Sequence, residues 1–75
     1  MDDLLIRQVA ELISRYLVAR PGAADTTRGV HDWWVDWPGP QAPLAVTEAA
    51  LELLRASGKV SCSNGVWRQA SEVRS

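Results

Sequence analysis

The hydrophobic positions of the first twenty residues recur every three or four residues, so they share one side of a helix. This apolar stripe consists of Leu5, Val9, Leu12, Ile13, Tyr16 and Leu17, and it is widened by Ile6 and Ala10. Asp2 or Asp3 can accept hydrogen bonds from the free amides at the helix start, and Pro21-Gly22 ends the periodic stretch. The pattern predicts an amphipathic first helix with one face in a core.

A second apolar stripe follows at positions i, i+3, i+4 and i+7, which predicts a helix over residues 26–35. Its members are Val30, Trp33, Trp34 and Trp37. Asp25 or Thr26 can cap this helix, and Gly29 permits a close helix crossing. His31 and Asp32 fall off the stripe. We expect Trp33 and Trp37 in the core and Trp34 half-covered, which makes Trp34 a candidate for partner binding because exposed tryptophans are typical of interfaces.

Residues 36–43 contain three prolines and therefore predict a short stiff loop. Pro43 can occupy the first turn of a third helix. In that helix Thr47, Leu51 and Leu54 share one face, bordered by Ala50, and we expect this face to be buried. Gly58 can adopt the left-handed conformation that ends a helix.

A β-hairpin is predicted after Gly58, because polar and apolar residues alternate on both sides of Asn64-Gly65. A two-residue turn at Asn-Gly fixes the register. The predicted pairs are Ser63 with Val66, Cys62 with Trp67, Ser61 with Arg68, and Val60 with Gln69. Val60, Cys62 and Trp67 then share one face, which we expect to be buried.

The segment AALELLRASGKV followed by VSCSNGVWRQ resembles the winged helix-turn-helix superfamily. The resemblance implies that residues 46–57 form the recognition helix and that the hairpin is the wing. The predicted fold is therefore α+β and mostly α, with three helices, a C-terminal hairpin and any extra short strand near residues 23–25 pairing onto the wing sheet. We expect a single domain over residues 1–70 and a frayed tail over residues 71–75.

Composition narrows the class of protein. The chain has 75 residues, a formal net charge of −1, one cysteine, four tryptophans and no phenylalanine. A net charge this close to zero provides no excess of positive charge that would attract nucleic acid. A single cysteine fits a reducing compartment. We find no signal peptide and no apolar run that could span a bilayer, so we expect a cytoplasmic protein that does not bind membranes.

Catalytic and metal-binding residues are scarce. The only histidine is His31 and the only cysteine is Cys62, and neither has flanking residues that would complete a nucleophilic pair or a zinc site. No glycine-rich phosphate loop is present. We therefore expect a protein that is not an enzyme and that has no metal site and no cofactor.

DNA binding is one functional hypothesis. The winged-helix resemblance implies groove-facing positions at Ala45, Val46, Glu48, Ala49, Glu52 and Leu53. Base reading favours Arg, Lys, Asn and Gln, and phosphate binding needs positive charge, whereas this face carries two glutamates. The wing would add only Lys59, Asn64 and Arg68. A dimeric DNA-binding regulator is therefore the alternative.

The same helix face suits a protein partner better. Val46, Ala49 and Leu53 are apolar residues that the core stripe does not use, and Glu48 and Glu52 flank them. Such a patch could seat a partner helix or a second copy of the chain, as a homodimer. The function predicted from the sequence is a small non-catalytic module that binds a protein through this face, through the tryptophan-rich segment, or through both.

Overall fold

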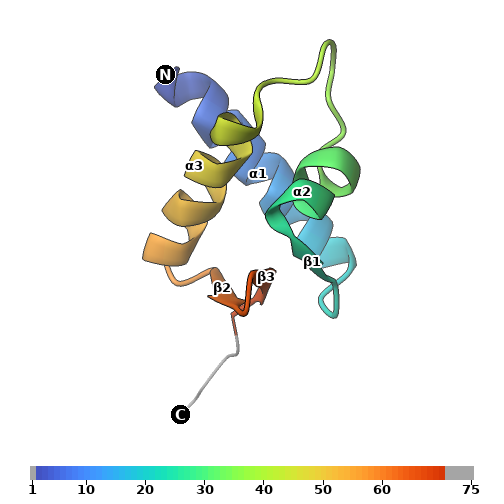
Figure 1. The fold of residues 1–75 in the computed structure, drawn as a ribbon, viewed down its shortest axis with the longest axis vertical. Helices are drawn as coiled ribbons and strands as arrows, with labels where there is room; N and C mark the ends of the chain where they lie inside the picture. The colour runs from blue at the N-terminus through green and yellow to red at the C-terminus, as the bar shows by residue number, and fades with distance from the viewer. Residues whose placement is uncertain (1, 71–75) are drawn as a thin grey trace.

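The computed structural model describes residues 2–70, which form an α+β fold that is mostly helical (Figure 1). The predicted tail, residues 71–75, lies outside the described residues. The elements in chain order are α1 (Asp3–Ala19), β1 (Ala24–Thr26), α2 (Thr27–Gly29), the π-helical turn η1 (Val30–Trp34), α3 (Leu44–Ala56), β2 (Val60–Ser63) and β3 (Val66–Gln69).

Helix α1 begins and packs as the sequence predicts. The carboxylate of Asp2 accepts hydrogen bonds from the backbone N–H groups of Leu4 and Leu5, at 3.0 and 3.4 Å. One face of the helix is buried, at Val9, Ala10, Ile13 and Leu17. This face packs against α3, which crosses it over much of its length (Figure 1).

The predicted second helix is a single turn of α-helix that continues as a π-helix. Thr26 caps it, because its Oγ1 accepts a hydrogen bond from the Gly29 N–H at 3.1 Å. The Asp25 carboxylate occupies the place that a Cβ on residue 29 would need. A side chain at position 29 would therefore displace the Asp25 carboxylate, and none of the three nearest atoms belongs to another helix.

The π-helical turn overturns three predictions about which side chains are buried. Trp33 was expected in the core but is 77% exposed, whereas Trp34, expected to be half-covered, is only 5% exposed. His31 was placed off the apolar stripe but is buried. An α-helix turns about 100° per residue, which would put residues 30 and 33 on one face, but the wider π turn rotates residue 33 outward. Trp34 instead points inward and stacks on Tyr16, with ring centroids 4.9 Å apart.

Helix α3 follows Pro43 and buries Thr47, Ala50, Leu51 and Leu54, as predicted. The prediction that Val46 lies on the outer face is wrong, because its side chain is only 4% exposed. Helix α3 contacts α1 on one side and α2 and η1 on another, so its buried face is wider than one stripe.

The three strands form an antiparallel sheet in the order β1–β3–β2. All four predicted pairs of the hairpin are confirmed, and Asn64 and Gly65 at its turn both have positive φ. The extra strand, predicted near residues 23–25, is β1. Val60 and Trp67 are buried as predicted, but Cys62 is exposed. Cys62 lies on β2, an edge strand of the sheet, whereas its partner Trp67 lies on the central strand β3.

Candidate protein-binding surface

His31 serves as a buried anchor between three segments. Its Nδ1 shares a 2.6 Å hydrogen bond with Oγ1 of Thr47 on α3. Its carbonyl oxygen accepts hydrogen bonds from Nε1 of Trp37, at 2.9 Å, and from Nε2 of Gln41, at 3.4 Å. These contacts attach the proline-rich loop and α3 to η1. The histidine thus has a structural explanation that needs no ligand.

Within residues 2–70, every buried side-chain nitrogen or oxygen has a hydrogen-bond partner, and no three His, Cys, Asp or Glu side chains come together as a metal site. Cys62, the other candidate nucleophile, lies exposed on β2. No buried polar group in this part of the chain is thus left to point into a ligand site. Within residues 2–70, the remaining candidates for a functional site are therefore exposed surfaces.

The outer face of α3 retains most of the residues that the sequence assigned to partner binding. Glu48, Glu52 and Leu53 are exposed and Ala49 is half-buried, whereas Val46 belongs to the core. Leu53 is 42% exposed, although it is a large apolar residue, and it lies in the last turn of the helix. It is therefore the leading apolar contact that this face offers.

The structure adds residues of α1 to this face, and the sequence did not assign them to it. A hollow of about 380 Å³ is lined by Asp3, Ile6, Arg7, Ala49, Glu52 and Leu53. A second hollow of about 350 Å³ is lined by Arg7, Ala10, Glu11, Ser14, Leu53, Leu54, Ser57 and Lys59. Arg7 and Leu53 line both hollows, and together we call the two hollows the α1–α3 groove.

Both signs of charge line the α1–α3 groove. Glu52 accepts hydrogen bonds from Arg55 one turn later on α3, including one from Nε at 2.9 Å. Glu11 accepts one from Nε of Arg15 at 3.2 Å. Among residues 2–70, Arg7 and Lys59 make no ion pair. These two cations are therefore available to a partner.

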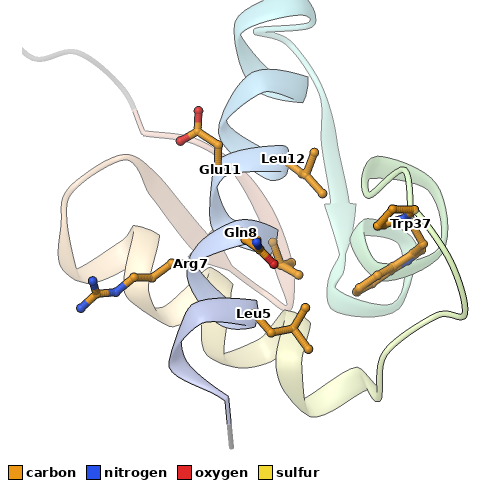
Figure 2. A pocket seen from close by; sticks show the side chains of 8 residues that line it. Leu5, Arg7, Gln8, Glu11, Leu12 and Trp37 are labelled. Carbon is orange, nitrogen blue, oxygen red and sulfur yellow. The ribbon is translucent and has the colours of Figure 1, made fainter.

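A third hollow, of about 430 Å³, lies on the other side of α1. Leu5 and Leu12 point from α1 toward Trp37, and Arg7 and Glu11 point away from it (Figure 2). The indole of Trp37 is fixed by its hydrogen bond to the His31 carbonyl. The side of the hollow that Trp37 forms is therefore apolar and held in place.

The tryptophan that the sequence selected for partner binding is the wrong one. Trp34 is buried against Tyr16, so it contributes to folding, whereas Trp33 presents its indole to solvent. Only the winding of η1 distinguishes these neighbours, and no apolar periodicity in the sequence could have revealed it. Trp33 replaces Trp34 as a surface candidate.

The residues assigned to the alternative function, DNA binding, are all exposed. Lys59 precedes β2, Asn64 lies in the hairpin turn and Arg68 lies on β3. The nearby Arg28 is engaged by Asp32, with 3.2 Å between Nε and Oδ2. The hairpin and the residue before it therefore offer two cations, Lys59 and Arg68, that make no ion pair within residues 2–70, and the outer face of α3 offers two glutamates.

No known protein family, curated protein sequence or solved structure shows a significant match to this chain. Among the described residues, no helix combines the length and the apolar character needed to cross a membrane.

Proposed function

We propose that this protein is a non-catalytic winged-helix module that binds another protein through the α1–α3 groove. The winged-helix interpretation is supported by the order of elements, in which a hairpin follows α3 directly and its second strand pairs with β1. The observation that carries the binding proposal is Leu53, an exposed leucine that lines two hollows between α1 and α3.

The energetics of the groove favour a protein partner. Apolar surface left in water costs about 25 cal/mol for each Å², and a partner that covers Leu53, Ile6 and Ala49 recovers that free energy. Glu48 and Glu52 border this apolar strip on α3. Charges at the border of an interface act mainly on the association rate and on the choice of partner.

DNA binding remains the alternative function, because the winged-helix proposal implies that α3 enters the major groove. We expect no tight binding to duplex DNA at physiological salt, since Glu48 and Glu52 would face the phosphates. Fluorescence anisotropy with a random duplex tests this expectation. Micromolar, salt-sensitive binding that weakens in the Arg68→Ala variant would favour the alternative instead.

Leu53→Lys tests the protein-binding proposal directly. We expect the variant to fold normally, because Leu53 is partly exposed, and to lose association, because a charge would then sit in the centre of the groove. Circular dichroism reports folding, and sedimentation together with pull-down reports association.

Trp33→Lys is the matched variant, because it also places a lysine at an exposed apolar position, but on η1. We expect Trp33→Lys to associate like the wild type. If it loses association and Leu53→Lys does not, the interface lies at η1. If Leu53→Lys unfolds the domain, Leu53 is a core residue and the groove is not a binding surface.

A further inference from the structure

We propose that the hollow between α1 and Trp37 binds a small, neutral, planar aromatic molecule that carries one amide-like polar group. This α1–Trp37 pocket, of about 430 Å³, is formed by α1 and the proline-rich loop, whereas the α1–α3 groove lies between two helices. Its volume falls within the range of about 300–1,000 Å³ that is usual for small-molecule sites. The inference adds a second site, with a different class of ligand, to the proposed function.

The walls of the α1–Trp37 pocket are largely apolar. Leu5 and Leu12, two turns apart on α1, point toward Trp37 (Figure 2). Both leucines are half-buried and pack against the core, and the core residue Val9 also lines the pocket. Pro38 extends the lining on the loop. A ligand in this pocket therefore meets mainly hydrocarbon and one indole, which favours an apolar body.

Trp37 is held in one orientation before any ligand binds. Its Nε1 donates the 2.9 Å hydrogen bond to the His31 carbonyl oxygen, and the His31 ring lies edge-on to the indole, with ring centroids 5.2 Å apart. His31 is itself buried and shares its hydrogen bond with Thr47. The proline that follows Trp37 further restricts its backbone. A ligand therefore loses little free energy to ordering this wall.

The hydrogen bond of Trp37 also decides which contacts the indole can make. An indole has a single N–H donor, and here the His31 carbonyl occupies it. Trp37 is thus left with apolar and π contacts only. A planar aromatic ring matches them best, because offset stacking adds to the gain from burying its surface.

The charged and polar residues of the lining narrow the class of ligand further. Arg7 and Glu11 line the pocket, but their side chains point away from Trp37 (Figure 2). A charged ligand would therefore lose water without gaining a partner. Gln8 also lines the pocket, and its carboxamide makes no side-chain hydrogen bond within residues 2–70. An amide offers both donors and an acceptor, so it suits a neutral amide on the ligand.

Benzamide tests the proposal, because it joins a planar ring to one neutral amide. Heteronuclear NMR spectra resolve the indole N–H group of each tryptophan during a titration of the wild-type chain. We expect a saturable shift at Trp37, with a Kd of about 1 mM or tighter, as suits a ligand of this size. Trp33 is the internal control, because its indole is 77% exposed and lies outside the pocket lining. Its signal should hardly move.

Two matched probes test the class of ligand. Benzoate keeps the ring but carries a negative charge, and cyclohexanecarboxamide keeps the amide on a ring that is not planar. We expect each to bind at least about fivefold more weakly than benzamide, because the first lacks a partner for its charge and the second cannot stack. Benzoate that binds as tightly as benzamide would contradict a neutral ligand.

Two exposed neighbours on α1 provide matched variants. Gln8→Ala should weaken benzamide at least about threefold, because it removes the amide partner. Arg7→Ala should leave the affinity unchanged, because that side chain points away from the pocket (Figure 2). Leu12→Asp places a carboxylate in the apolar wall and should abolish binding. Circular dichroism establishes that each variant is folded, and if Leu12→Asp is not, Gln8→Ala and the matched probes carry the test.

Three results would overturn the inference. The first is the absence of a saturable Trp37 shift up to about 10 mM benzamide, which would leave a side chain of a partner protein as the occupant. The second is an equal shift at Trp33, which would mean unspecific stacking on indoles. The third is equal weakening by Gln8→Ala and Arg7→Ala, or by neither. All three leave the proposed function intact, because that function depends on Leu53 and its own test.

Discussion

Leu51→Ala is expected to lower the free energy of unfolding by about 2–5 kcal/mol, the range for truncating a buried leucine. Leu51 is fully buried on α3, where that helix packs against α1. A 75-residue domain is stabilised by roughly 4–11 kcal/mol at 0.05–0.15 kcal/mol per residue. The variant should therefore be largely unfolded at moderate denaturant, as followed by circular dichroism during a urea titration.

Leu53→Ala, two residues later on the same helix, is the matched control. Because Leu53 is exposed, we expect its truncation to change the free energy of unfolding by no more than about 0.5 kcal/mol. Equal destabilisation by both variants would mean that α3 does not present the faces described here.

Trp34→Ala is the second large expected effect. The indole of Trp34 is buried and stacks on Tyr16, so its removal opens a cavity between η1 and α1. Truncation of a buried tryptophan costs about 3–5 kcal/mol. Thermal or urea unfolding, compared with the wild type, measures the loss.

Trp33→Ala provides the comparison, because Trp33 and Trp34 are adjacent and chemically identical. We expect its effect on stability to stay within about 0.5 kcal/mol, as for other exposed positions. The reverse order, with Trp33 the costlier residue, would restore the α-helical stripe predicted from the sequence and contradict the π-helical turn.

Features that depend on neighbouring residues could be predicted from the sequence. The hairpin register follows from the two-residue Asn64-Gly65 turn, since the turn length alone decides which residues pair. The cap at Asp2 and the end of α3 near Gly58 likewise follow from the local chemistry of a carboxylate and a glycine.

Features that depend on distant segments were not predictable in the same way. The burial of Val46 requires knowing that α2 and η1 lie against α3. Cys62 is exposed on a strand that lies at the edge of the sheet, and that place follows from the pairing of β1 with the far side of β3. The outward direction of Trp33 depends on a π turn, for which the sequence carries no simple signal.

The two sides of the α1–α3 groove also differ in how far the sequence could predict them. The residues on α3, namely Ala49, Glu52 and Leu53, could be predicted because the apolar stripe of that helix is regular. These residues lie outside the stripe. The residues on α1 could not be predicted, because Ile6 and Arg7 join the groove only through the way in which α1 and α3 cross.

The position of β3 in the sheet constrains the order in which the molecule assembles. Strand β3 is the central strand, yet it follows every other described element in the chain. During synthesis the ribosome releases α1, β1, α2, η1 and α3 first, so β1 waits without a partner until residues 66–69 emerge. The hydrogen bond from Trp67 Nε1 to Thr27 Oγ1, at 2.8 Å, then closes a loop of about forty residues. The sheet therefore cannot be completed before residues 66–69 have left the ribosome.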